Sequence, residues 1–490
     1  MRHISRRILL RGAGLGLASN LAPRHVVAQP TMLKSTASGS VLNDASRLNP
    51  VSVARQAVVR TSDEQGLIAE MRALLRDAAR DGLPVCVGGA RHSMGGQSIA
   101  RGGVAVSLAA SSCEPDTATR SYRVRGGTHW HDVIRRLDPL GFSVAVMQSN
   151  HDFSVAGTLC ANAHGWPVPY GPFGTTVRSF RLMLADGTLV TCSPSENDEL
   201  FRLVIGGYGL FGIVLDVDVA MVPNVQLLPT FDRVTATQIA EKFMIVARTS
   251  PVQLAYGRLS LARERFLQDG LVVSYKPMPV QRNPLPPAGQ SAVYAFLSRK
   301  LFRSQIGSDR GKQMRWLAET VVLPRAATTH AVTRNALLNY PVSVLAETNP
   351  RRTDILHEYF LSPERFGDFL TACRLLIPES GQDLLNVTLR HVERDAISVL
   401  SYAPARRVAA VLLFSQAATP EADRAMAVLT QRLIETALEL GGSFYLPYRL
   451  HALPEQVRTA YPRLEEFIAR KRHYDPGLRF RNLMWDRYFG

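Results

Sequence analysis

The chain has 490 residues, 46% of them hydrophobic and 20% charged, a balance that excludes wholesale disorder. Its length exceeds one ordinary core and predicts two or three domains. The net charge is +16, but the basic residues are dispersed and form no runs, which argues against nucleic-acid binding. Five scattered cysteines show no metal-ligand spacing, and their odd number argues against a full disulfide framework, so we expect no metal site.

Residues 1–29 have the order of a targeting segment: an Arg-rich start, a short Gly/Ala/Leu stretch and a small-residue cleavage site at Ala28. The core of Ser5 to Leu10, SRRILL, resembles a twin-arginine signal and predicts bacterial export to the periplasm. No stretch is long and apolar enough for a confident spanning helix, so we expect no transmembrane span in the mature chain. Residues 30–48 are small and polar and predict a linker.

Helical and strand patterns alternate after this linker, which fits an α+β domain. Strands are predicted at 51–53 and 57–60, and a helix follows the capping signal around Asp63. Two short β segments, 85–87 and 104–106, then enclose a loop with four glycines. Such a loop lets backbone N–H groups approach a pyrophosphate, although the spacing is not the G-x-G-x-x-G fingerprint. A glycine-rich hairpin without a ligand is the alternative.

Two later stretches share this character. Residues 148–178 are rich in Gly, Ala, Asn and His with few large aliphatic side chains, which favours close packing against something flat. After a hairpin signal at Asp186-Gly187, a second glycine cluster at 206–212 leads into a strand over 214–222.

These motifs, in this order, resemble the FAD-binding domain of the vanillyl-alcohol oxidase superfamily, the PCMH-type FAD-linked oxidases. The resemblance covers residues 50–223 and resumes around Tyr474-Asp475-Pro476. It implies an α+β fold with a two-subdomain PCMH-type FAD-binding domain at 49–223. It further implies a substrate (cap) domain with an antiparallel sheet at 224–440, and a C-terminal segment at 441–490 that returns to the FAD domain. Residues 192–223 are similar to cytokinin dehydrogenases, whereas Asn162-Ala163-His164-Gly165 is closer to the sugar-oxidising members.

The implied cofactor is FAD. His92 matches the position at which many relatives attach the flavin covalently, and we favour that bond over a hydrogen bond from a non-covalent site. Cys160 matches a small hydrogen-bonding residue, so we expect a free thiol there rather than a second link. The other cofactor contacts implied by the resemblance are Gly88, Gly89, Ala90, Arg91, Ser93, Gln97, Ser154, Thr158, His164, Ile213 and Asn482.

The catalytic residues are less clearly marked. Cytokinin dehydrogenases carry an Asp nine residues before the position of Thr158, where this chain has Ser149. The nearest acid is Asp152, which either acts as a base or caps a loop. Glu358 resembles a Glu-containing strand that faces the flavin in sugar oxidases.

Three further side chains come from the cap domain and the C-terminal segment. Arg390 either neutralises a substrate or the reduced flavin, or makes a surface salt bridge. Tyr445 and Tyr448 lie in a strand that carries catalytic groups in relatives, or they pack in the core of the sheet. Arg449 or His451 would lower the pKa of Tyr448 and prepare it to deprotonate a hydroxyl.

Together these residues predict an FAD-dependent oxidoreductase that removes hydride from a C–OH carbon of a sugar, polyol or lactone-type small molecule. Its reoxidant would be O2 or a respiratory acceptor. Amine (C–N) oxidation of the cytokinin dehydrogenase type is the alternative, and a non-catalytic flavin-binding protein is a remote one.

Overall fold

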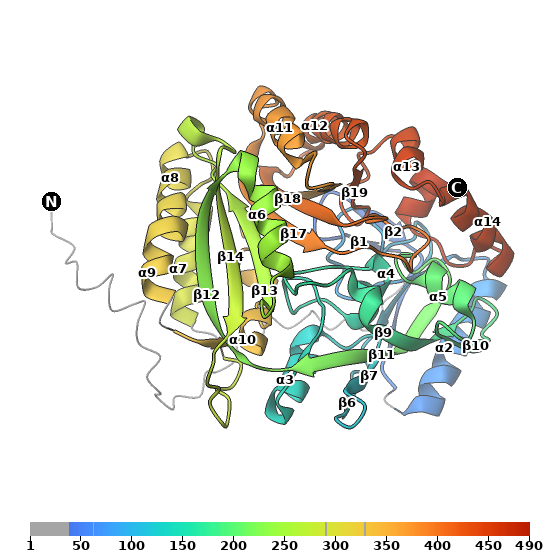
Figure 1. Cartoon of the computed structure of the whole chain (residues 1–490). Coiled ribbons are helices and arrows are strands. Elements are labelled where there is room, and N and C mark those ends of the chain that lie inside the picture. Colours follow the sequence, from blue (N-terminus) through green and yellow to red (C-terminus); the bar gives the residue numbers. More distant parts are fainter. Residues whose placement is uncertain (1–38, 62, 290–291, 328–329) are drawn as a thin grey trace.

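The computed structural model describes residues 39–490 except 62, 290–291 and 328–329. The predicted signal segment, 1–29, lies outside these residues. The described chain contains a small parallel sheet, a second sheet that is antiparallel and a large antiparallel sheet, with helices packed around them (Figure 1). The predicted α+β class with an antiparallel cap sheet is confirmed.

The parallel sheet has the order β3-β5-β4 and carries the glycine-rich loop. Its strands are β3 (Arg55–Val59), β4 (Val85–Val87) and β5 (Val104–Leu108). Helix α2 (Glu64–Arg80) connects β3 to β4, and its N-cap Asp63 accepts a hydrogen bond from Gly66 N at 2.8 Å. Because β4 and β5 are parallel neighbours, the chain between them must return from one end of the sheet to the other. The loop is therefore not a hairpin turn.

The second sheet has the order β10-β9-β11-β7-β6, with β8 paired to the far end of β11. Strand β11 is long and leads directly into the first strand of the large sheet, so it joins the two halves of the molecule. The strands are β6 (Cys113–Asp116), β7 (Ser121–Arg125), β8 (Phe142–Val144), β9 (Val177–Met183), β10 (Leu189–Cys192) and β11 (Ile213–Pro223), and the helices are α3 (Trp130–Leu137), α4 (Val155–Ala161) and α5 (Asp198–Val204).

The large sheet has eight strands in the order β15-β12-β14-β13-β17-β18-β16-β19. Helices α6 (Ala236–Arg248), α11 (Phe366–Glu379) and α12 (Pro420–Glu439) pack on one another and on one face of it (Figure 1). Helices α7 (Ala292–Arg303), α8 (Asp309–Leu317), α9 (Leu323–Ala327) and α10 (Arg334–Leu338) lie beside its β12 edge. The strands are β12 (Gln226–Thr235), β13 (Leu254–Leu259), β14 (Asp269–Pro277), β15 (Val332–Thr333), β16 (Arg352–Leu361), β17 (Asp383–Val392), β18 (Arg407–Ala417) and β19 (Ser443–Phe444).

The C-terminal segment returns to the parallel sheet after helices α13 (Pro454–Ala460) and α14 (Leu464–Tyr474). Phe480 forms a parallel bridge with Val85 of β4, and Val85 N donates to Arg479 O at 2.6 Å. Phe480 is fully buried in the core that α2 covers. The last residues of the chain therefore complete the domain that its first strands begin.

The linker expected over 30–48 is wrong for its described part. Strand β1 (Ser40–Leu42) pairs with β2 (Val51–Val53), and Asp44 accepts a hydrogen bond from Gly96 N at 2.7 Å. Both Asp44 and Ser46 are buried. Small polar side chains are typical of linkers, but here they are buried because each finds a hydrogen-bond partner.

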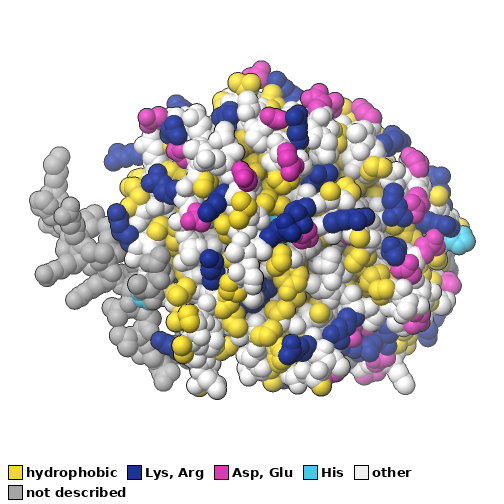
Figure 2. All heavy atoms as spheres, in the orientation of Figure 1, with side chains coloured by type: hydrophobic (Ala, Val, Ile, Leu, Met, Phe, Trp, Pro, Cys, Tyr) yellow, Lys and Arg dark blue, Asp and Glu magenta, His cyan; other side chains and the backbone are white. Residues whose placement is uncertain are grey.

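Basic and acidic side chains are interspersed over the face shown in Figure 2, so the surplus of positive charge is spread out there. Among the described residues, no helix is both long and apolar enough to cross a bilayer. The same residues contain no group of His, Cys, Asp and Glu side chains arranged to hold a metal ion.

Replacing Phe480 by Ala should destabilise the protein by about 3–5 kcal/mol, because a fully buried aromatic ring is removed from the contact between the two ends of the chain. Chemical denaturation followed by tryptophan fluorescence measures this loss. Leu375→Ala, which removes a side chain that is 69% exposed, is the matched control and should change stability by less than about 0.5 kcal/mol. Equal stability of the two variants would contradict the proposed contact.

Candidate active site

A cavity of about 1680 Å³ lies between the glycine-rich loop and α4 on one side and the face of the large sheet that α6, α11 and α12 leave uncovered on the other. Its walls include the glycine-rich loop, α4 and residues from seven strands of the large sheet, β12 to β18. The volume exceeds the roughly 300–1,000 Å³ of an ordinary small-ligand pocket. The cavity therefore has room for a large cofactor and a substrate together.

The glycine-rich loop lies very close to the start of α4. A Cβ atom on Gly89 would lie 2.0 Å from Ser154 Oγ, so only glycine fits there. Ser154 is the N-cap of α4 and accepts a hydrogen bond from Gly157 N at 3.3 Å. Arg91 adopts a left-handed backbone with φ of 51° and donates to Ser107 Oγ at 3.0 Å. The loop is thereby folded tightly, with its backbone lining the cavity.

Most of the predicted cofactor contacts do line this cavity: Gly88, Gly89, Ala90, Arg91, His92, Ser93, Gln97, Ser154, Thr158, Cys160 and His164. The Cys160 thiol is free, and burial raises its pKa to about 12, so it is protonated at neutral pH. The expectation that Cys160 makes no second link to the flavin stays a prediction.

The His92 ring packs against Phe153, with ring centroids 4.4 Å apart. Burial lowers the pKa of His92 below that of an ordinary histidine, which Asp152 only partly offsets. The imidazole is therefore neutral at pH 7, the form in which one ring nitrogen carries a free electron pair.

Two predicted cofactor contacts do not line the cavity. Ile213 is fully buried in the core beneath α2, while its neighbours Gly212 and Val214 face the cavity. Asn482 donates to Gln97 O and to Tyr208 O, both at 3.0 Å, and ties the loop to the second glycine cluster. Both predictions are corrected. The residues next to Ile213, and not Ile213 itself, face the cavity, and Asn482 supports the glycine-rich loop without lining the cavity.

Gln97 is both a wall of the cavity and a clamp. Its amide nitrogen donates to Leu446 O at 2.7 Å and to Tyr448 O at 3.0 Å, and its amide oxygen accepts from Gly95 N at 2.8 Å. The glycine-rich loop is therefore fixed to the segment that carries Tyr448.

Three polar side chains form a buried chain of contacts at the cavity wall. Tyr448 Oη donates to Glu358 Oε2 at 3.0 Å, and Glu358 Oε1 lies 2.7 Å from His164 Nε2. Glu358 extends from β16 and His164 follows α4, so the two domains meet in this contact. All three residues line the cavity.

Burial raises the pKa of Glu358, but the combined effect of His164, Arg390 and Tyr448 outweighs it, and the pKa is lowered overall. Glu358 is therefore ionised at neutral pH. Burial and the adjacent Glu358 carboxylate raise the pKa of Tyr448 well above its ordinary value, so this phenol is a proton donor in the resting site.

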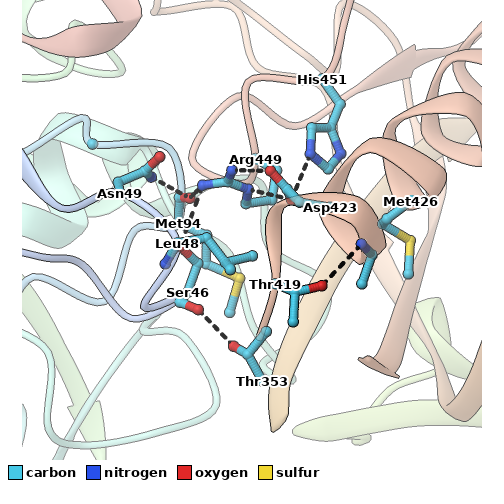
Figure 3. A network of polar contacts seen from close by, with 12 residues as sticks. Ser46, Leu48, Asn49, Met94, Thr353, Thr419, Asp423, Met426, Arg449 and His451 are labelled. Atoms are coloured by element: carbon cyan, nitrogen blue, oxygen red, sulfur yellow. Dashed lines mark hydrogen bonds and ion pairs between the residues drawn. The ribbon is translucent and has the colours of Figure 1, made fainter. Parts of the chain in front are cut away.

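The expected activation of Tyr448 by Arg449 or His451 is wrong. Arg449 Nε donates to Asp423 at 3.1 Å, and His451 Nε2 lies 3.0 Å from the same carboxylate (Figure 3). Arg449 also donates to Met94 O at 3.1 Å. Both side chains point toward Asp423 of α12, and the Arg449 contact with Met94 O links α12 to the glycine-rich loop.

The remaining predicted catalytic residues have different positions. Arg390 lines the cavity and donates from Nη2 to Ser149 Oγ, so it is not a surface salt bridge. Tyr445 lines the cavity, and its hydroxyl donates to Ala161 O at 2.8 Å. Asp152 does not line the cavity; its carboxylate accepts from Val342 N. Of its two predicted roles, the geometry agrees with capping a loop.

Sequence reasoning missed three arginines in the cavity, Arg47, Arg258 of β13 and Arg315 of α8, and the whole wall formed by α8 and α9. Tyr256 and Arg258 alternate along one strand and face the cavity together. That alternation was the available signal, but it did not reveal which strand would lie beside β13.

Comparison with known proteins supports a cofactor at the glycine-rich loop. The family model described as an FAD binding domain matches residues 56–193. Cytokinin dehydrogenase 8 of Oryza sativa subsp. indica is 32% identical over 178 residues, which are 34% of each chain. Cytokinin dehydrogenase 4 of Arabidopsis thaliana is 34% identical over 145 residues, 28% of each chain. The chain thus matches about a third of the length of these curated relatives.

A solved structure is similar over nearly the whole chain. The 6-hydroxy-D-nicotine oxidase of Arthrobacter nicotinovorans aligns with a TM-score of 0.61 at 18% identity, covering 91% of this chain and 97% of the other. At that identity the likeness shows the fold alone. Residues 56–193 form an FAD-binding domain, and FAD is the cofactor of the cavity.

The residues of the cavity fit FAD. Arg91 Nε on the loop, His164 Nδ1 after α4 and Arg390 Nη1 on β17 are buried nitrogen atoms without a hydrogen-bond partner among the described residues. Unpaired buried polar atoms are costly, and a polar ligand in the cavity would satisfy them. The loop glycines let a pyrophosphate approach the backbone, and the opposite walls would contact the flavin ring.

Replacing Gly89 by Ala should lower FAD occupancy of the purified protein about tenfold or more, because the new Cβ collides with Ser154 and displaces the loop. The flavin-to-protein absorbance ratio measures this. Gly367→Ala, where a Cβ meets nothing within 4 Å, is the control and should keep full occupancy. Full occupancy in both variants would show that the loop does not hold the cofactor.

Proposed function

Because the chain belongs to the superfamily of PCMH-type FAD-linked oxidases, we propose that it is an FAD-dependent oxidoreductase acting on a C–OH carbon of a small molecule. Bound FAD supplies the acceptor for the hydride that leaves this carbon. The observation that carries the proposal is the buried contact chain from Tyr448 through Glu358 to His164. It gives the substrate proton a route away from the reacting oxygen.

The proton transfer follows from the protonation states. The substrate hydroxyl donates its proton to Tyr448 Oη while Tyr448 passes its own proton to Glu358 Oε2. Glu358 can accept because it is ionised, and His164 on its other oxygen holds the carboxylate in place. The substrate thus loses one hydride and one proton and becomes a carbonyl compound.

The surroundings of Ser149 support an alcohol over an amine. Cytokinin dehydrogenases resemble this chain over the FAD domain, and the solved neighbour is by name an oxidase of a hydroxylated nicotine. Because both names point to substrates that contain amines, oxidation of a C–N bond is the second candidate reaction for this chain. However, the Arg390 guanidinium donates to Ser149 at the position where an acid was expected. A fixed positive charge there disfavours the cationic iminium product of amine oxidation.

The type of alcohol is narrowed by the cavity walls. Sugars, polyols and lactones were the first expectation, and they need many hydrogen-bond partners. The walls beyond the contact chain are largely aliphatic and aromatic, including Phe302, Leu317, Leu323, Leu356, Val411 and Leu413. Such walls favour an alcohol with an apolar body.

We further propose that FAD is bonded covalently to His92, whose neutral ring lies in the loop that lines the cavity. The reoxidant would be O2 or a respiratory acceptor. Export to the periplasm rests on residues 1–29 alone, and secretion of the chain with Arg6 and Arg7 replaced by Lys would test it.

Acid precipitation separates the two forms of flavin binding. The flavin should stay in the pellet of the wild-type protein and appear in the supernatant of His92→Ala, because a covalent bond survives denaturation. Cys160→Ala, which removes the cysteine that lines the cavity, should behave as wild type. Release of flavin from the wild-type protein would contradict a covalent link.

Tyr448→Phe should lower the rate of flavin reduction by an alcohol substrate about 10²–10⁴-fold, since it removes the group that contacts the substrate proton. Glu358→Gln should lower this rate as well. In the wild type the rate should fall as the pH drops through the pKa of Glu358, which lies below the ordinary glutamate value, and the variant should lose this pH dependence. Stopped-flow absorbance measures these rates. Tyr474→Phe, which removes only an exposed contact to Glu199, is the control. An unchanged rate in Tyr448→Phe would remove the proposed route.

A further inference from the structure

We propose that the substrate of this cavity carries a carboxylate, which Arg258 binds with Arg390 beside it. The substrate class is then a hydroxy acid with an apolar body. This inference rests on the proposed function for its hydroxyl group, but the binding of the carboxylate does not depend on turnover.

Arg258 is a cation without an acidic partner among the described residues. Its recorded hydrogen bonds all use Nη1, which donates to Asn386 Oδ1 at 2.9 Å and to Thr388 Oγ1. The guanidinium also lies 5.1 Å from the Tyr256 ring centre. These contacts fix the guanidinium plane at the cavity wall while Nε and Nη2 keep their donors, a planar pair suited to a carboxylate.

A second guanidinium is held against the first. Arg315 Nη2 donates to the same Asn386 Oδ1 at 2.7 Å, while its Nε bonds Glu319 at 2.8 Å. The Asn386 amide oxygen thus accepts hydrogen bonds from both guanidinium groups, and among the described residues only Arg315 of the two has an acidic partner, Glu319. Like charges this close repel each other, so an anion in the cavity would stabilise the arrangement.

Arg390 extends the positive surface toward the proton route. Arg258 lies opposite Thr388 on the neighbouring antiparallel strand, and Arg390 is two residues further along that strand on the same face. Such diagonal neighbours are about 7–8 Å apart, within reach of two long side chains. Arg390 Nη1 is buried without a partner among the described residues.

The face of the large sheet that lines the cavity therefore carries different chemical groups at its two ends. Glu358 and Tyr448 take a proton at one end, and Arg258 offers unpaired donors at the other. The Glu358 carboxylate is already paired with His164, so it leaves the charge of Arg258 uncompensated. A hydroxy acid whose hydroxyl lies at Tyr448 and whose carboxylate lies at Arg258 satisfies both ends.

The test uses the oxidised, FAD-loaded protein and ω-phenyl carboxylates from phenylacetate to 5-phenylpentanoate, each compared with its primary amide. Titration is followed by the change in flavin absorbance. We expect at least one carboxylate to bind about tenfold or more tightly than its amide, since a charge-assisted bidentate contact is lost in the amide. Equal binding of acids and amides throughout the series would overturn the inference.

Variants assign the effect to Arg258. Arg258→Gln should reduce the preference for the acid to within about threefold, and Arg258→Lys should restore part of it because the charge returns. Arg263→Gln, which removes an exposed arginine of the same domain, should keep the wild-type preference. An unchanged preference in Arg258→Gln with retained flavin would overturn the assignment.

The result also separates this inference from the proposed function. Flavin reduction by neutral alcohols with no preference for acids would leave the alcohol oxidation standing and remove the carboxylate site. A strong preference for acids with no flavin reduction by any hydroxy acid would leave the site standing and remove the oxidation.

Discussion

The amide of Gln97 is the constraint on which the site depends. It joins Gly95 of the loop to the backbone of Leu446 and Tyr448, so the cofactor loop and the segment that bears the proton donor move as one body. The Asn482 side chain donates a hydrogen bond to the backbone carbonyl of Gln97. A buried amide satisfied on both its oxygen and its nitrogen is costly to break, and this rigidity keeps Tyr448 and the loop in register.

Around that junction the charges are arranged unevenly. One carboxylate, Glu358, is surrounded by donors and stays ionised although it is buried. On the sheet beyond it, Arg258 and Arg390 lack a carboxylate within ion-pair distance among the described residues. In the proposed function the first group accepts a proton, and in the further proposal the second group holds an anion. Under these proposals, their separation along one sheet face would orient a substrate relative to the flavin.

The sequence predicted the α+β class and most of the loop because glycines and short strands act locally. It did not predict side-chain positions that are determined by contacts between residues far apart in the sequence. Ile213 was out of phase because a bulge between Val214 and Asp216 breaks the alternation of β11, so the spacing could not show which face Ile213 takes. Arg449 follows Tyr448 directly, yet its partner Asp423 comes from α12. Arg258 acquires its role from Thr388, 130 residues later, and no local pattern carries that pairing.

The parallel bridge between Val85 and Phe480 also joins segments that are far apart in the sequence. Asn482 donates to Gln97 O across a separation of 385 residues. Closing a chain segment of this length costs more conformational entropy than a local contact. The glycine-rich loop therefore gains this part of its support only when the intervening chain is folded, and damage far from the loop in sequence can loosen it.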